Sequence, residues 1–330
     1  MKIAIIGAGF SGLATAWTLL QDKHQFEVVL IDGQGIGAGA SGVAAGLMHP
    51  FAGAHSKLNH WGREGFTASL ELLKASEKAL ERSPYKISGI LRPTLFPIQV
   101  EEFKTASEKY PEEIQWLSQE EAKALIPGIV EAPGILIKKG ITVYPEVYLQ
   151  GLWLACKELG AVFALQKINS LAELSDFDAI VVAMGAHCSD LKELSKLPLS
   201  YTKGQILELE WPEGLPPLPM PLNSQIYCVM HPDNKRCLAG STYERNFISS
   251  AIDVGIAKKE ICPKLSAIYP PLREAKIINC HSGIRVSAPQ HLPLLKQVNS
   301  RCIVLTGMGS KGLLYHALFA QRLTELLLTF

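Results

Sequence analysis

The sequence predicts an α/β fold, built on a parallel sheet into which a second, mostly antiparallel α+β part is inserted. Two observations support this prediction. The first 32 residues have the order strand, glycine-rich turn, helix, strand, acidic residue, which is the order of a complete βαβ unit. Residues 201–287 contain long extended runs joined by a turn, as in an antiparallel sheet. A buried strand and glycine-rich turn at 302–312 repeat the opening pattern, so both ends of the chain are expected to share one sheet.

The opening unit predicts a Rossmann-like dinucleotide site. Gly7 permits the tight turn after the first strand, and Gly9 lets backbone approach a pyrophosphate. Gly12 allows the following helix to lie close to the sheet, and the start of that helix offers free N–H groups to phosphates. Asp32, twenty residues after Gly12, is placed to accept hydrogen bonds from a ribose.

Composition excludes several classes of protein. The chain has 330 residues, with 32 Lys and Arg against 31 Asp and Glu, so no strong overall field attracts nucleic acid or a membrane. The seven cysteines include no Cys-x-x-Cys pair, which favours reduced, mostly buried thiols over a disulfide framework or metal site. The leucine-rich segment 313–330 is too short and too polar to span a bilayer, so a cytoplasmic protein is expected.

The stretch after Asp32 is unusually rich in glycine. Residues 33–42 contain five glycines in ten positions, and small residues continue as far as Gly46. Backbone without bulky side chains can approach a flat ligand closely, so we expect this stretch to line the ligand. A flexible surface loop is the alternative.

Regular elements are expected along the rest of the chain. Helices are predicted at 61–82, at 119–126 behind a capping box that begins with Ser118, and at 145–159. Pro93 and Pro97 are expected to keep the residues after them extended. The predicted strands are 87–92, 178–186, 201–211, 225–232, 236–242, 276–287 and 302–306.

Several motifs occur in an order that resembles one enzyme family. They are the opening unit, Gly39–Gly42 with Ala44–Gly46, Ala183–Gly185, Gly283–Arg285 and the last glycine-rich turn. This order is similar to that of the FAD-dependent D-amino-acid-oxidase and glycine-oxidase superfamily. Within it, the chain most resembles the C-terminal oxidoreductase domain of the bifunctional tRNA 5-methylaminomethyl-2-thiouridine biosynthesis enzyme.

Two stretches support that finer resemblance. Gly283–Pro293 is similar to the family's G-V-R-x-A-T-x-D-H-L-P, with Gln290 in place of the acidic residue. Gly309–Leu313 is similar to its G-S-R-G-L, with Lys311 in place of the arginine. The companion methyltransferase domain is not in this chain.

The resemblance implies non-covalent FAD, because Ile284 stands where some relatives carry a flavin-linked cysteine. It also implies a discontinuous FAD-binding domain at 1–82, 140–190 and 288–330, and a substrate-binding domain at 83–139 and 191–287. Asp32 would meet the adenosine ribose, Ile168 the adenine through its backbone, and Ala44–Met48 the flavin ring. The implied FAD-binding residues are Gly7, Gly9, Phe10, Ser11, Gly12, Asp32, Gly33, Gln34, Ala40, Ser41, Ala44, Ala45, Gly46, Leu47, Met48, Ile168, Ala183, Met184, Gly185, Gly283, Gly307, Met308, Gly309, Ser310, Lys311, Gly312 and Leu313.

Four residues are candidates for contact with a substrate. Arg285 comes after the family's glycine and would hold a substrate carboxylate, for which a planar guanidinium is well suited; a structural ion pair is the alternative. Tyr227 and His231 lie on the strand expected to face the flavin, and Lys311 could meet an anionic group. His49 could be a polar contact beside the ring, although a histidine with satisfied hydrogen bonds in the core is the simpler interpretation.

The resemblance also implies a reaction: oxidation of a C–N bond in an N-substituted glycine or amino acid. Hydride would pass from the α-carbon to flavin N5, and water would then hydrolyse the imine. The carboxymethylaminomethyl group of a tRNA wobble uridine is one candidate substrate, and free glycine, sarcosine or a D-amino acid is the alternative. An NAD-dependent dehydrogenase and a flavin-binding protein without turnover are the competing classes. The sequence does not indicate an oligomeric state.

Overall fold

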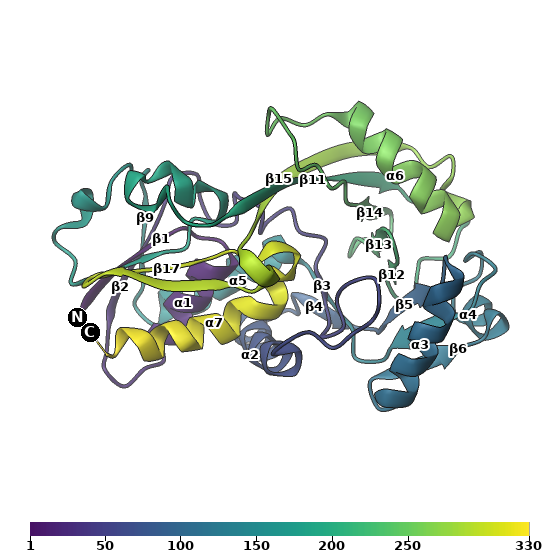
Figure 1. The fold of residues 1–330 in the computed structure, drawn as a ribbon, viewed down its shortest axis with the longest axis horizontal. Helices are drawn as coiled ribbons and strands as arrows, with labels where there is room; N and C mark the ends of the chain where they lie inside the picture. Colours follow the sequence, from purple (N-terminus) through teal and green to yellow (C-terminus); the bar gives the residue numbers. More distant parts are fainter. Residues whose placement is uncertain (330) are drawn as a thin grey trace.

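Three sheets organise the chain in the computed structural model, which describes residues 1–329 (Figure 1). The first is parallel except for one antiparallel edge strand, β16. Its strands, in spatial order, are β16 (Leu294–Asn299), β17 (Cys302–Thr306), β10 (Ala179–Val182), β1 (Lys2–Ile6), β2 (Glu27–Asp32) and β9 (Val162–Leu165). Segments from both ends and the middle of the sequence therefore lie side by side in one sheet.

Alternating side chains of this sheet build a core on each face. Ile3, Ile5 and Val181 point to the face packed with helices, while Ala4 and Ile6 point to a second buried cluster on the other face. Burial on both faces explains why these strands read as continuous apolar runs. The covering helices are α1 (Phe10–Leu20), α2 (Gly62–Leu80), α5 (Pro145–Glu158) and α7 (Gly312–Leu327).

The second sheet is mostly antiparallel and has eight strands. In spatial order they are β15 (Ile277–Ser287), β11 (Ser200–Glu210), β14 (Arg236–Gly240), β13 (Tyr227–Met230), β12 (Leu222–Asn223), β5 (Ile90–Pro93), β7 (Gly134–Ile137) and β6 (Ile114–Leu117). Helix α6 (Val254–Ile268) packs on one face through Ile261 and Leu265, and α3 (Pro97–Lys109) packs near β5, β6 and β7 through Phe103 (Figure 1). Thr202 and Arg285 are cross-strand partners on β11 and β15 and lie on the opposite face from α6, which packs on Leu207 and Leu209.

Smaller elements connect the two large sheets. An antiparallel sheet has the order β3 (Leu47–Met48), β8 (Ile141–Val143) and β4 (Tyr85–Ile87). Helix α4 (Gln119–Leu125) begins at the predicted capping box, where Ser118 and Glu121 bond each other's backbone N–H groups. The short 3₁₀ helices are η1 (Leu171–Leu174), η2 (Gly185–Asp190), η3 (Lys192–Leu194), η4 (Pro270–Leu272), η5 (Pro289–His291) and η6 (Gly309–Lys311).

The predicted α/β fold with an antiparallel insertion is confirmed, but two local predictions are wrong and one helix was missed. The predicted strand 87–92 is two strands in different sheets, because Gly89 turns the chain with φ +78°. The stretch after Pro97 is not extended: Pro97 occupies the first turn of α3, where a missing N–H costs nothing. Helix α6, which contains Pro263, was not predicted.

The proposed domain boundaries remain a prediction, and residue 330, the end of the last predicted segment, lies outside the described residues. All seven cysteines are free, and six of them are buried. Across residues 1–329, no helix is both long enough and apolar enough to cross a bilayer.

Candidate active site

The turn between β1 and α1 requires glycine at two positions. Gly7 has φ +107°, and a Cβ there would lie 2.4 Å from the Ala183 carbonyl oxygen. A Cβ on Gly12 would lie 1.8 Å from the Gly7 oxygen, so only glycine lets α1 start this close to the strand. No side chain caps α1 at Gly9, and its first turn has no acidic residue. The start of this helix is therefore suited to an anion.

The carboxylate of Asp32 organises the same turn. Its Oδ2 accepts a hydrogen bond from the Ala8 N–H at 2.8 Å. Its Oδ1 accepts from the N–H groups of Gln34 and Gly35 at 2.8 and 3.0 Å. A carboxylate offers about four acceptor positions, so one position remains for a ribose hydroxyl. Asp32 thus shapes the loop as well as being available to a ligand.

The glycine-rich loop after Asp32 folds back onto the start of α1. The Ser41 hydroxyl accepts a hydrogen bond from the Phe10 N–H at 3.1 Å, and a Cβ on Gly9 would lie 2.8 Å from this hydroxyl. The Gly37 N–H donates to the Ala8 carbonyl at 3.0 Å. Gly9, Phe10 and Ser41 are therefore neighbours, as the sequence predicted for a phosphate-binding region.

A second free helix end approaches from the far end of the chain. Gly307 has φ +76°, and the turn it begins leads through η6 into α7, whose first turn also has no capping side chain and no acidic residue. A Cβ on Gly312 would lie 3.5 Å from the Phe10 ring. A Cβ on Gly283 would lie 3.2 Å from the Ala40 Cα, so β15 reaches the same place. Segments some 300 residues apart in sequence converge here.

The other predicted FAD residues lie around this centre. Ala183, Met184 and Gly185 come after β10, where Ala183 contacts Gly7. Ala44 to Gly46 lead into β3, which Leu47 and Met48 form, and a Cβ on Gly33 would lie 3.3 Å from the Lys167 side chain. Ile168 does not lie in a strand as predicted: β9 ends at Leu165, and the Ile168 side chain is buried in the core beyond it. Met308, Gly309, Ser310 and Leu313 belong to the turn and helix after β17.

Arg285 lies flat over a glycine on the open face of the eight-stranded sheet. A Cβ on Gly204 would be 2.6 Å from its Nη2. Nη1 donates to the Ser241 hydroxyl at 3.1 Å and Nη2 to the Thr242 carbonyl at 2.9 Å. Its Nε is buried without a partner. Arg285 forms no ion pair with any residue in 1–329, so the structural ion pair considered as an alternative is not formed there.

Tyr227 lies beside Arg285 and, like it, is placed over a glycine of the sheet. It is paired with Gly240 in the β13–β14 ladder, and a Cβ on Gly240 would lie 2.6 Å from the Tyr227 hydroxyl. Burial raises the pKa of Tyr227, although nearby Arg285 acts in the opposite direction. The phenol is therefore neutral and can donate a hydrogen bond. Gly204 and Gly240 form a floor under the two side chains, and a glycine inside a strand is the sequence signal for such a close approach.

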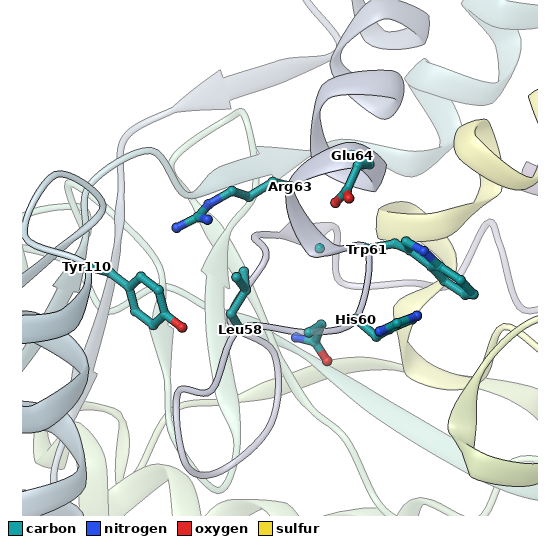
Figure 2. A pocket seen from close by; sticks show the side chains of 8 residues that line it. Leu58, His60, Trp61, Arg63, Glu64 and Tyr110 are labelled. Atoms are coloured by element: carbon teal, nitrogen blue, oxygen red, sulfur yellow. The ribbon is translucent and has the colours of Figure 1, made fainter.

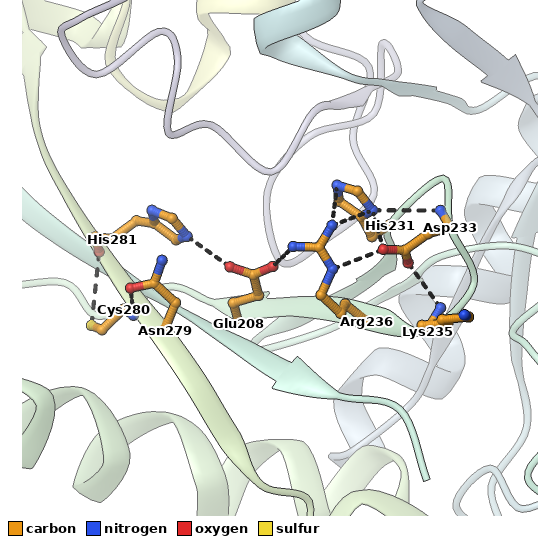
Figure 3. A network of polar contacts seen from close by, with 8 residues as sticks. All are labelled: Glu208, His231, Asp233, Lys235, Arg236, Asn279, Cys280 and His281. Carbon is orange, nitrogen blue, oxygen red and sulfur yellow. Dashed lines mark hydrogen bonds and ion pairs between the residues drawn. The ribbon is translucent and has the colours of Figure 1, made fainter. Parts of the chain in front are cut away.

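The other two predicted substrate residues lie elsewhere. His231 belongs to a polar network with Arg236, Asp233, Glu208 and His281 (Figure 3). It is four residues along from Tyr227, or about 13 Å for a strand, so the structure does not bring it to Arg285. Lys311 is half-buried with Nζ 5.8 Å from the Tyr315 ring centre, and burial lowers its pKa.

His49 is more notable than the sequence suggested. Its Nδ1 is buried without a partner, and its Nε2 lies 3.5 Å from the Asn223 amide. The interpretation of His49 as a core histidine with satisfied hydrogen bonds is therefore wrong. Burial, followed by the charge of Arg92, lowers its pKa to about 3. Asn223 pairs with Tyr227 across the β12–β13 ladder, so His49 meets the same part of the sheet.

These features fit FAD. The starts of α1 and α7 have no capping side chain at their N-cap residues and no acidic residue in the first turn, which suits a pyrophosphate. The glycines leave room for close backbone approach, and Asp32 retains an acceptor for ribose. Fold and site together define an FAD-binding oxidoreductase. The chain belongs to the DAO family, described as FAD dependent oxidoreductase, which matches residues 2–326.

Individual relatives agree with this assignment. The chain is 26% identical over 345 residues to the putative thiamine biosynthesis oxidoreductase ThiO of Rhizobium etli, covering 100% of this chain and 97% of ThiO. It is 22% identical over 324 residues to the tRNA 5-methylaminomethyl-2-thiouridine biosynthesis bifunctional protein MnmC of Maricaulis maris, covering 98% of this chain and 51% of MnmC. The chain thus spans about half the length of that bifunctional relative.

Solved structures share the fold. Glycine oxidase from Geobacillus kaustophilus superposes with a TM-score of 0.82 at 22% identity, covering 99% of this chain and 93% of that chain. Iminodiacetate oxidase (IdaA) from Chelativorans sp. BNC1 gives 0.84 at 21% identity, covering 99% and 95%.

Proposed function

We propose that the protein oxidises the C–N bond of an N-substituted glycine or an amino acid, with non-covalently bound FAD. The observation that carries this proposal is Arg285, a cation with a free Nε–H and no acidic partner within residues 1–329, beside a neutral tyrosine hydroxyl on a floor of two glycines. A carboxylate is the ligand that the free side of this guanidinium binds best, because a guanidinium can donate two parallel hydrogen bonds to a carboxylate.

The roles of the residues depend on their positions. Arg285 binds the carboxylate through Nε and the second N–H of Nη2, while Ser241 and Thr242 hold the guanidinium in place. The Tyr227 hydroxyl donates to the same carboxylate or to the nitrogen. The glycine floor lets the substrate lie close to the sheet, which orients its α-carbon and excludes water. Bound FAD supplies the acceptor for the two electrons of the C–H bond.

The finer version of the proposal is the carboxymethylaminomethyl group of a tRNA wobble uridine. The name of the MnmC relative supports this version, whereas the glycine oxidase and iminodiacetate oxidase neighbours support small amines. Free glycine, sarcosine and D-amino acids are therefore the alternative substrates.

Anaerobic mixing tests the shared core of both versions. Purified flavin-loaded protein is mixed with sarcosine and, separately, with N-methylethylamine, which replaces the carboxylate by a methyl group. Glycine, iminodiacetate, D-alanine and bulk tRNA from cells lacking the modification enzyme complete the panel. We expect flavin bleaching and carbonyl product only with carboxylate-bearing amines. Bleaching by none of them, or equally by N-methylethylamine, would refute the proposal.

A further inference from the structure

A hollow of about 420 Å³ lies at the end of the β11–β15 ladder. The hollow is lined by two tyrosines, one arginine, one histidine and three serine or threonine residues. The side chains used in the argument below are Tyr201, Thr202, Tyr243, Arg245, Ser287 and His291. Its volume lies within the range of about 300–1,000 Å³ that is usual for small-molecule sites.

The hollow adjoins the candidate substrate site. Thr202 is the cross-strand partner of Arg285, so the two side chains lie on the same face of the sheet. The centre of the Tyr243 ring is 5.4 Å from the Arg285 Cζ. On another side, a Cβ on Gly309 would lie 2.9 Å from the Ser287 hydroxyl, so the hollow also reaches the turn before α7. A substrate held by Arg285 can therefore extend into it.

The chemistry of the lining combines a flat ring with a free cation. The Tyr243 side chain is 53% exposed, which is unusual for a large aromatic residue next to an active centre. The Arg245 Cζ lies 5.3 Å from its ring centre, and Arg245 forms no ion pair with any residue in 1–329. A hydrogen bond from Arg245 lowers the pKa of Tyr243. Two guanidinium groups thus share one exposed ring, and neither has an anionic partner among the described residues.

A second surface hollow shows the contrast. It has a volume of about 610 Å³ and is lined by His60, Trp61, Arg63 and Tyr110 among others (Figure 2). There the cation is already neutralised, because Arg63 Nε and Nη2 donate to the Glu113 carboxylate at 3.0 and 2.7 Å. This hollow also lacks a contact with Arg285 among those described.

We propose that the hollow beside Arg285 binds a nucleotide: the base stacks on Tyr243 and the phosphate meets Arg245. The proposal rests on the function proposed above and identifies the rest of the substrate as a nucleotide attached to the oxidised amine. Stacking on an aromatic side chain is tolerant of base identity, and the hydroxyls and His291 offer hydrogen bonds to sugar and base edges. The local cation compensates for a net charge of only +1.

Binding of uridine 5′-monophosphate to the flavin-loaded protein tests the proposal. Equilibrium dialysis compares this nucleotide with uridine and with ribose 5-phosphate. We expect the nucleotide to bind about tenfold or more tighter than either fragment, the equivalent of about 1.4 kcal/mol. Tyr243→Ala should weaken both nucleotide and uridine by about ten- to hundredfold, and Tyr243→Phe should restore both. Arg245→Gln should weaken the nucleotide about tenfold and leave uridine unaffected.

Arg63→Gln, in the other hollow, is the matched control and should bind the nucleotide like wild type. The proposal is overturned if the protein does not bind the nucleotide. It is also overturned if Tyr243→Ala and Arg63→Gln weaken nucleotide binding equally. A hairpin RNA with an unpaired uridine separates the two sources of the nucleotide: it displaces the mononucleotide if the natural ligand is RNA and fails to do so if it is a free nucleotide. If the protein oxidises sarcosine but does not bind the nucleotide, only the nucleotide site is refuted. If it binds the nucleotide but oxidises no amine, only the proposed function is refuted.

Discussion

Replacing Arg285 by alanine should abolish discrimination between an amine that carries a carboxylate and one that does not. Of the five guanidinium N–H groups, one on Nη1 donates to Ser241 and one on Nη2 donates to Thr242, which leaves Nε–H and the second Nη2–H as a pair for the substrate carboxylate. A hydrogen bond to a charged group contributes about 1.5–3 kcal/mol. Two such bonds amount to about 3–6 kcal/mol, or about 10²- to 10⁴-fold in kcat/KM.

The assay is steady-state kcat/KM for sarcosine and for N-methylethylamine, with flavin content measured on the same samples. Arg285→Ala should lose activity with sarcosine and show no change with N-methylethylamine, which lacks the carboxylate. It should keep its flavin, because most of the predicted FAD contacts lie on other elements and the substitution leaves the backbone of β15 at Gly283 unchanged. Arg285→Lys should recover only part of the loss, since an ammonium cannot form the planar fork. Arg273→Ala, at an exposed arginine in the loop after η4, controls for loss of a charge. A yellow Arg285→Ala protein with wild-type activity would refute the reasoning.

Two further predictions concern the cofactor site and acid stability. Gly12→Ala places a methyl group 1.8 Å from the Gly7 oxygen, so the variant should lose bound flavin or fail to fold. Gly39→Ala is the control, because a Cβ there has nothing within 4 Å, and it should keep a wild-type ratio of flavin to protein absorbance. Burial lowers the pKa of His49 to about 3 and that of His316 to about 4. Both pKa values lie below the value of about 6.5 expected in the unfolded chain, so the unfolded state binds more protons. The free energy of unfolding should therefore fall as the pH drops from about 6.5 to about 4. The slope should be at most about 1.4 kcal/mol per pH unit for each histidine. Urea unfolding measured across this range should show a shallower slope for His316→Gln, and an unchanged slope would contradict the assignment.

The parts of the fold that sequence predicted well depend on neighbours close in the chain. The turn from Gly7 to Gly12 needs glycine partly for local reasons: Gly7 has a positive φ, and a Cβ on Gly12 would meet the Gly7 carbonyl, although a Cβ on Gly7 would also meet the distant Ala183. Ser118 and Glu121 cap α4 within one turn. Arg285 is predicted from a motif of the family that the chain resembles, and Tyr227 from a strand pattern. The structure places the two side by side, and their roles toward a substrate stay a prediction.

The parts that sequence missed depend on contacts far along the chain. Gly89 divides the predicted strand because Ile90 and Ile87 pair with different partners, β7 and β8. His49 lies against Asn223, some 170 residues later in the chain, and its unsatisfied nitrogen is a result of this long-range packing. The hollow beside Tyr243 forms where β11, β15 and η5 meet, and none of these segments predicts it alone.

The order of strands in the parallel sheet has a consequence for how the protein is made. Strand β10 receives its second neighbour only when β17, residues 302–306, has been synthesised. Until then the apolar residues Ala179–Val182 form an open edge, which is a template for pairing with another chain. The pocket for FAD also lacks its second helix end before residue 312, so a nascent chain cannot hold the cofactor through both ends of the site. We therefore expect the yield of soluble protein to depend on chaperones during translation and on FAD supply immediately afterwards.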